Sequence, residues 1–120
     1  MKKKFLFSAA LAFSVTTLLF TPNVKAQGDP RVVEITAKRF QFVPAEISLK
    51  KGETVTSKLA SEDVTHGFYN KPLKIDGDVV AGKTTEITIT PETVGRYVTI
   101  CDHFCGTNHG NMRMVINVLE

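Results

Sequence analysis

One stretch of the chain reads RYVTICDHFCGTNHGNMRMVINV, from Arg96 to Val118. Both ends of this stretch are rich in β-branched residues, which favour β-strands. The residues between these ends, from Cys101 to Met112, are therefore expected to form a loop at one end of a sheet. The flanking segments thus indicate a β-fold. Side chains in the loop between them can converge on a single point, so the loop is the first place to look for a binding site.

The loop carries four metal-binding side chains with the spacing C-x3-C-x3-H-x2-M, namely Cys101, Cys105, His109 and Met112. Both cysteines of the chain fall here, with two of its three histidines and one of its three methionines. Thiolate, thioether and imidazole ligands together select copper in preference to magnesium, calcium or manganese. The motif therefore predicts a copper site.

Two other interpretations of the motif explain it less well. A disulfide between Cys101 and Cys105 would close a very short loop, which adds little stability, and would leave His109 and Met112 without a role. Zinc also binds cysteine and histidine, but its sites have a different spacing and thioethers seldom serve it. The presence of Met112 favours copper.

The N-terminus has the features of a secretory signal peptide. A basic segment, Met1–Lys4, precedes an apolar run from Phe5 to Phe20, and Val24-Lys25-Ala26 matches a cleavage site. We expect a signal peptide over residues 1–26 and one domain over residues 27–120, located in the periplasm or elsewhere outside the cytoplasm. The alternative is an uncleaved anchor, but 16 apolar residues fall short of the roughly 20 that span a bilayer.

The net charge excludes one class of partner. The predicted leader holds four of the fifteen basic residues and none of the twelve acidic ones, so the remaining 94 residues carry a formal charge of −1. Without excess positive charge there is no electrostatic basis for binding nucleic acid or an anionic membrane. We expect no nucleic acid, and a membrane contact only through a partner or an uncleaved N-terminal segment.

Short segments rich in β-branched residues and separated by glycine and proline predict an all-β fold, a Greek-key antiparallel β-sandwich. The polar residues Lys50–Glu53 predict a hairpin turn. The expected strands are Val32–Ala37, Glu46–Leu49, Thr54–Leu59, His66–Tyr69, Leu73–Ile75, Thr84–Thr90, Gly95–Ile100 and Met114–Leu119. The expected core contains Val32, Ile35, Leu59, Ile87, Ile89, Val98, Ile100 and Ile116.

A further candidate ligand, His66, lies at the start of an expected strand and is followed by Gly67, which permits a close backbone approach. A lone histidine is more often an ordinary surface or core residue than a ligand. In a sandwich, however, one edge commonly supplies a ligand to a site formed by the last loop. We therefore expect His66 to join the loop ligands.

The segments Glu62–Phe68 and Cys101–Met112 together resemble the CuA-type cupredoxin domain. This domain occurs in cytochrome c oxidase subunit II, particularly the short B-type form, and in nitrous oxide reductase. The resemblance covers about Val32 to Leu119. It implies two copper ions bridged by Cys101 and Cys105, with His66 and Met112 completing one ion, and His109 with the backbone carbonyl of His103 completing the other. The implied activity is one-electron transfer, without catalysis by this chain alone.

Three features depart from the pattern of that family. His103 stands where oxidase subunits usually have Glu or Gln, so the magnesium role of that position does not carry over. Its side chain is either an exposed loop residue or an extra copper ligand. The chain has no Trp, the residue through which electrons reach copper in many oxidase subunits. A cleaved leader would also leave no membrane helix, unlike most subunits II.

Three functions remain open from the sequence. The first is a CuA electron carrier, free or as an oxidase subunit, with a c-type cytochrome as donor and oxidase subunit I as acceptor. The second is a mononuclear blue-type cupredoxin that uses His66, Cys105, His109 and Met112 and leaves Cys101 spare. The third is a copper storage or delivery protein, for which exposed methionine and histidine near the loop would be the signature.

The acidic residues Glu62, Asp63 and Asp102 are expected near the metal end of the sandwich. They form either a docking surface for a basic cytochrome or an ordinary solvated rim.

Overall fold

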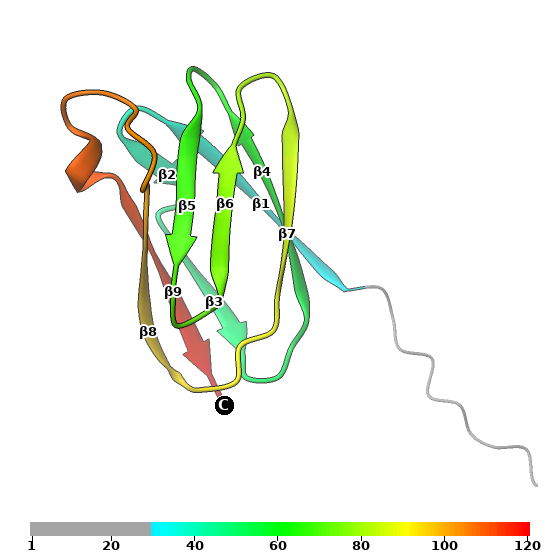
Figure 1. Cartoon of the computed structure of the whole chain (residues 1–120). Coiled ribbons are helices and arrows are strands. Elements are labelled where there is room, and N and C mark those ends of the chain that lie inside the picture. Colours follow the sequence, from blue (N-terminus) through cyan, green and yellow to red (C-terminus); the bar gives the residue numbers. More distant parts are fainter. Residues whose placement is uncertain (1–29) are drawn as a thin grey trace, which may run out of the picture.

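Two β-sheets packed face to face make up the computed structural model, which describes residues 30–120 (Figure 1). One sheet has the strand order β2-β1-β4-β7 and the other β3-β9-β8-β5-β6. The elements are β1 (Arg31–Lys38), β2 (Gln41–Val43), β3 (Glu46–Lys50), β4 (Val55–Ser61), β5 (His66–Asn70), β6 (Ile75–Val79), β7 (Thr84–Ile89), β8 (Gly95–Ile100), the 3-10 turn η1 (His109–Asn111) and β9 (Arg113–Leu119). The predicted all-β sandwich is confirmed. The predicted leader lies outside the described residues.

Two strand pairings are parallel, which the prediction of an antiparallel sandwich missed. β1 pairs with β4 and β3 pairs with β9 in this way, whereas the other pairings are antiparallel. Parallel neighbours need a crossover connection. Here the opposite sheet supplies it, because β3 follows β1 in the chain but belongs to the other sheet.

The residues Lys50–Glu53 form a turn, but the prediction of a hairpin was wrong. The Glu53 amide donates a hydrogen bond to the Lys50 carbonyl at 3.0 Å, and Gly52 has a φ of 79°, a left-handed conformation that favours glycine. The turn leads from β3 in one sheet to β4 in the other. Turn residues indicate that the chain reverses, and they do not indicate which sheet the next strand joins.

One predicted strand is misplaced along the chain. Leu73 and Lys74 lie in a turn, and the strand begins at Ile75 and continues to Val79. This strand, β6, contains two aspartates and a glycine, which are poor strand formers. Pairing with the preceding strand β5 holds it in the sheet, so its conformation depends on a partner strand and not on the strand propensity of its own residues.

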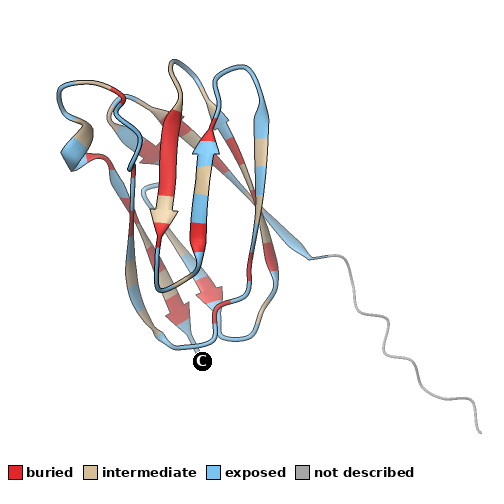
Figure 2. Cartoon of the chain, viewed as in Figure 1, coloured by how far each residue is buried: buried red, intermediate tan, exposed pale blue. Residues whose placement is uncertain are grey.

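The core lies between the sheets, and along most strands its buried residues alternate with more exposed ones, whereas β5 is buried along nearly its whole length (Figure 2). Ile35, Leu59, Ile89 and Ile116 are buried as expected, and Ile87 packs against them partly buried. The rings of Phe42 and Phe68 add an edge-to-face contact with centroids 5.3 Å apart.

Three residues expected in the core are exposed instead. Val32 is 49% exposed, Val98 40% and Ile100 39%. Val32 is an odd number of positions from the buried Ile35, and Val98 and Ile100 flank the buried Thr99. Because successive side chains of a strand point to opposite faces, these three residues belong to the outer face. Apolar residues on both faces concealed the register.

The metal-binding loop closes the hairpin between β8 and β9, as expected. Ile100 lies opposite Arg113 in the ladder, and the Cys101 amide donates to the Met112 carbonyl at 3.1 Å. The loop lies at the same end of the sandwich as the beginning of β5 (Figure 1). The fold thus brings His66 next to a loop that begins 35 residues later.

Candidate metal centre

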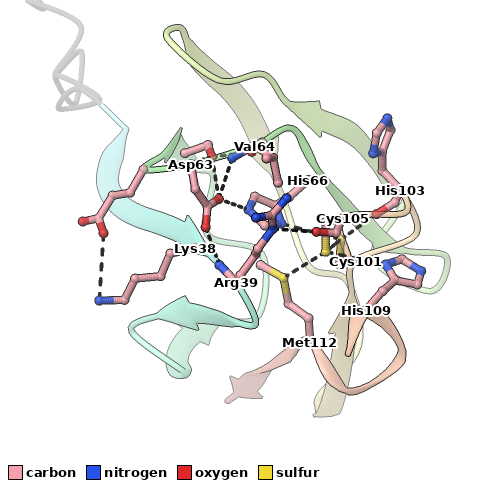
Figure 3. Close-up of polar contacts among 12 residues, drawn as sticks. Lys38, Arg39, Asp63, Val64, His66, Cys101, His103, Cys105, His109 and Met112 are labelled. Atoms are coloured by element: carbon pink, nitrogen blue, oxygen red, sulfur yellow. Dashed lines mark hydrogen bonds and ion pairs between the residues drawn. The ribbon is translucent and has the colours of Figure 1, made fainter. Parts of the chain in front are cut away.

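His66 is fixed by a carboxylate so that one ring nitrogen faces the cysteines. The side chain is fully buried, and its Nε2 lies 2.7 Å from Asp63 Oδ1. A hydrogen bond donated from Nε2 to a carboxylate leaves Nδ1 with a free lone pair. Nδ1 lies 4.0 Å from Cys101 Sγ (Figure 3). The contact with Asp63 therefore orients the predicted ligand with Nδ1 toward the cysteines.

Hydrogen bonds keep Asp63 ionised even in mildly acidic solution. Burial of the side chain disfavours the charged form, but the bonds donated by the Arg39 amide, His66 and the Val64 amide outweigh it and lower the pKa to about 2. The amide of Arg39 lies 2.8 Å from Oδ2, and that of Val64 lies 2.6 Å from Oδ1. Asp63 therefore acts as a fixed anchor for His66.

We predict that Asp63→Ala weakens copper binding by roughly tenfold to a hundredfold, the usual cost of losing a residue that orients a metal-binding histidine. Competition with a copper chelator of known affinity measures the effect. Asp76→Ala is the matched control, since Asp76 is exposed on β6. Equal affinities for the two variants would show that the bond to His66 does not orient the ligand.

Gly67 allows the loop to approach β5 closely, as the sequence predicted. A Cβ atom at this position would lie 2.0 Å from Asp102 Oδ1 and 2.6 Å from the His103 amide nitrogen. The Gly67 amide also lies 3.3 Å from Cys101 Sγ and donates a hydrogen bond to it. Any larger residue would displace the backbone that carries Cys101 and His103.

The two cysteines lie side by side as buried free thiols. Their sulfurs are 3.6 Å apart. Cys101 Sγ lies 3.1 Å from the His103 carbonyl oxygen, and Cys105 Sγ lies 3.8 Å from His109 Nδ1 and 3.9 Å from Met112 Sδ. Burial, reinforced by the neighbouring Cys101, raises the pKa of Cys105 to about 11. Its thiol is therefore protonated at neutral pH until a metal displaces the proton.

The short turn η1 places the last two candidate ligands. The His109 amide donates to the Gly106 carbonyl and the Met112 amide to the His109 carbonyl, both at 3.1 Å. His109 is partly buried, whereas Met112 is only 1% exposed. The turn thus brings an imidazole nitrogen and a thioether sulfur to the same thiol, Cys105.

His103 contributes its backbone to the cluster, and its side chain does not join it. The ring is exposed and its Nδ1 lies 3.2 Å from the Phe104 carbonyl. It projects away from the two sulfurs, while the His103 carbonyl faces Cys101 (Figure 3). Of the six residues expected at the site, the structure brings together five side chains and one carbonyl.

Two residues that support the cluster were missed from the sequence. Asp63 was considered only as a surface charge, although its spacing of three residues before a candidate ligand was a usable signal. The Arg39 Nε donates a hydrogen bond to the Cys105 carbonyl at 2.8 Å. This contact joins residues 66 positions apart, and nothing in the local sequence indicates it.

Two of the three acidic residues considered as either a docking surface or a solvated rim are engaged in contacts within the chain. Glu62 lies 3.9 Å from Lys38 in an exposed ion pair, and Asp63 is turned inward on His66 and two amides. Asp102 remains exposed. The arrangement gives little support to an acidic surface that receives a basic cytochrome.

The donor set fits copper. A group of His66, Cys101 and Cys105 has its ligand atoms within 4.8 Å of one another, and a thioether, a second imidazole and a carbonyl surround it. Sulfur and imidazole ligands without a direct carboxylate are typical of copper rather than of magnesium, calcium or manganese. The cluster can thus hold copper through atoms that the fold has already brought together.

Comparisons with known proteins agree with this geometry. A family model described as the cupredoxin-like domain matches residues 9–114. Cytochrome c oxidase subunit 2 of Thermus thermophilus is 33% identical over 88 residues, covering 73% of this chain and 65% of the relative. The nitrous-oxide reductase of Cupriavidus necator is 34% identical over 95 residues, covering 76% of this chain and 15% of the relative. The chain spans less than two thirds of the length of the oxidase subunits it matches.

A solved structure shows the same fold. The periplasmic domain of subunit II of cytochrome oxidase from Bradyrhizobium japonicum superimposes with a TM-score of 0.69 at 16% identity, covering 75% of this chain and 84% of that domain. The resemblance to oxidase subunit II and to nitrous oxide reductase, based on the two short segments, is therefore confirmed. Among the described residues, no helix is long and apolar enough to cross a membrane.

Proposed function

The chain belongs to the cupredoxin-like family, and from this premise we propose that it binds two copper ions in a CuA-type centre and carries single electrons. One observation carries the proposal. The sulfurs of Cys101 and Cys105 lie 3.6 Å apart in one buried cluster with His66, so both thiolates are in reach of the same ions. A copper pair held by two shared thiolates accepts and releases one electron with little change in geometry.

The remaining residues divide between the two ions. His66 and Met112 would complete one, and His109 with the His103 carbonyl would complete the other. Asp63 orients His66, and Arg39 donates a hydrogen bond to the Cys105 carbonyl. Gly67 has no side chain and so leaves room for the loop backbone. These contacts fix the ligands before metal binds and keep them in place during oxidation and reduction, which favours rapid electron exchange.

Metal uptake must remove the proton from Cys105, whose pKa is raised to about 11 by burial and by Cys101. Binding therefore releases protons and strengthens as the pH rises. Protonation of the thiol competes with copper throughout the neutral range.

The blue-type mononuclear alternative leaves Cys101 without a role. In the structure Cys101 Sγ is not a spare thiol, because it contacts His66 Nδ1, Cys105 Sγ and the Gly67 amide. The storage alternative predicts exposed methionine and histidine near the loop. His103 is exposed, but Met112 and Met114 are each only 1% exposed, so neither thioether is presented at the surface. Both observations favour the dinuclear electron carrier.

We infer the setting of this function from the relatives. The similar domain from Bradyrhizobium japonicum is a periplasmic part of an oxidase subunit. A leader over residues 1–26 would deliver this chain to the same side of the membrane. Its proposed partners are redox proteins, with a c-type cytochrome as donor and oxidase subunit I as acceptor. Electron exchange with each purified partner tests these assignments.

Counting copper in the purified protein tests the proposal itself. Two ions per chain are expected after reconstitution under reducing conditions. A single ion per chain would favour the mononuclear alternative, for which the ligands His66, Cys105, His109 and Met112 suffice.

We also predict that Met112→Leu retains both copper ions and raises the reduction potential by about 60 mV. For a one-electron couple this equals a tenfold change in the equilibrium constant for reduction. A weak thioether donates electron density to the oxidised state, so its removal disfavours oxidation. Redox titration measures the change. Met114→Leu is the control, because Met114 is equally buried. Loss of all copper from Met112→Leu would identify the thioether as a ligand essential for binding.

A further inference from the structure

A shallow depression of about 220 Å³ opens on the surface directly beside the metal cluster. Its lining includes Arg39, Val64, His103, Phe104, Cys105 and Gly106. Cys105 is a proposed copper ligand, so the depression is a place where another molecule comes within contact distance of the electron-carrying centre.

Two contacts connect this depression to the ligands. Arg39 Nε donates a hydrogen bond to the Cys105 carbonyl at 2.8 Å. The ring of Phe104, which is 75% exposed, lies with its centroid 5.9 Å from that of His109. A molecule seated between Arg39 and Phe104 would therefore contact two residues that each touch a proposed copper ligand. Arg39 is hydrogen-bonded to Cys105, and Phe104 packs against His109.

The charge of the depression is positive. Arg39 is permanently protonated, and among the described residues no carboxylate forms an ion pair with its guanidinium group. No acidic side chain belongs to the lining. Asp63 accepts bonds from the Arg39 and Val64 amides and from His66, and Glu62 pairs with Lys38. Asp102, next to His103 in the chain, is exposed but does not line the depression. A cation beside an exposed aromatic ring is a surface for an anionic group.

We propose that this depression is the docking point for a redox partner that presents surface carboxylates, with Arg39 pairing with the carboxylate and Phe104 packing against the partner. The inference rests on the proposed electron-transfer function and specifies its partner. Of the two alternatives considered for Glu62, Asp63 and Asp102, it favours the solvated rim over a docking surface for a basic cytochrome.

The first test measures binding without electron transfer. Hexacyanocobaltate(III), a redox-inert trianion, is titrated against isotope-labelled protein whose copper is fully reduced, and again against the metal-free chain. Amide shifts are expected at Thr65 and over residues 103–106. They should be lost in Arg39→Gln and retained in Arg39→Lys. They should also be retained in Arg96→Gln, whose charge lies at the other end of β8, about 16 Å from Cys101 along the strand.

The second test measures electron transfer with two oxidants of opposite charge. One electron passes from the reduced protein to hexacyanoferrate(III), giving hexacyanoferrate(II), or to tris(phenanthroline)cobalt(III), giving its cobalt(II) form. At low ionic strength Arg39→Gln is expected to slow the reaction with the anion about fivefold. This is the rate change expected when one partly screened attraction between the arginine and the anion is lost. The reaction with the cation should slow less, so the ratio of the anion rate to the cation rate falls, whereas a change at the Cys105 carbonyl would slow both reactions alike and leave the ratio unchanged.

The proposal is overturned if the anion shifts amides elsewhere or still binds Arg39→Gln. It is also overturned if Arg39→Gln slows electron transfer to both oxidants alike. That result would show that Arg39 acts on the copper site through its hydrogen bond to the Cys105 carbonyl. Because the titration of the metal-free chain requires no copper, it decides the docking surface even if the proposed electron-transfer function fails.

Discussion

Cys105→Ser is expected to remove nearly all copper from the protein, whereas Cys101→Ser is expected to retain about one ion per chain. Cys105 Sγ lies within 3.9 Å of Cys101 Sγ, His109 Nδ1 and Met112 Sδ, so it is the sulfur common to the dinuclear and mononuclear ligand sets. Without Cys101, the ligands His66, Cys105, His109 and Met112 still form a complete blue-copper set.

Copper analysis and visible absorption of the two variants measure this difference. Serine is nearly the same size as cysteine, so circular dichroism should show an unchanged fold in both and serves as the control. An unchanged spectrum in Cys101→Ser would show that Cys101 is not a ligand. Equal retention of copper by the two variants would show that Cys105 has no special place in the cluster.

The second large effect concerns the metal-free protein. We predict that protein prepared in an oxidising medium takes up little copper until it is reduced, because a disulfide between Cys101 and Cys105 cannot supply two thiolates. The sulfurs are already 3.6 Å apart. The raised pKa of Cys105 lowers the fraction of reactive thiolate, so oxidation near neutral pH should be slow and should accelerate as the pH rises.

The fold itself is expected to survive this oxidation. The buried residues Ile35, Leu59, Phe68, Ile89 and Ile116 lie in a core formed by both sheets, and each such side chain contributes about 1.5–3 kcal/mol when buried. Thiol titration and circular dichroism before and after reduction measure both parts of the prediction. Free thiols that persist in metal-free protein after prolonged aeration at alkaline pH would contradict it, as would a chain that folds only when copper is added.

The sequence was most informative where residues of one chemical type, such as metal ligands, lie within one short segment of local structure. The spacing of Cys101, Cys105, His109 and Met112 within one hairpin loop predicted a cluster that the structure brings together. Gly67 predicted the close backbone approach that places His66 against it. Local residue types suffice for such predictions, because the loop is short and both strands that flank it have clear β-branched patterns.

Other features depend on contacts between distant segments and were not accessible from local pattern. The register of Val98 and Ile100 was lost because apolar residues occupy both faces of β8. The hairpin expected at Lys50–Glu53 connects two sheets instead. Arg39 reaches Cys105 across 66 positions, and its charge changes the kind of partner that the surface fits. These properties follow from strand order, which short segments do not encode.

The most direct test of the dinuclear site is the electron paramagnetic resonance spectrum of the oxidised, copper-loaded protein, recorded with copper counted in the same sample. Two thiolates shared between two ions predict one unpaired electron delocalised over both, and so hyperfine structure from two equivalent copper nuclei with two ions per chain. Hyperfine structure from one nucleus, with one ion per chain, would contradict the account and assign the protein to the mononuclear blue-copper type.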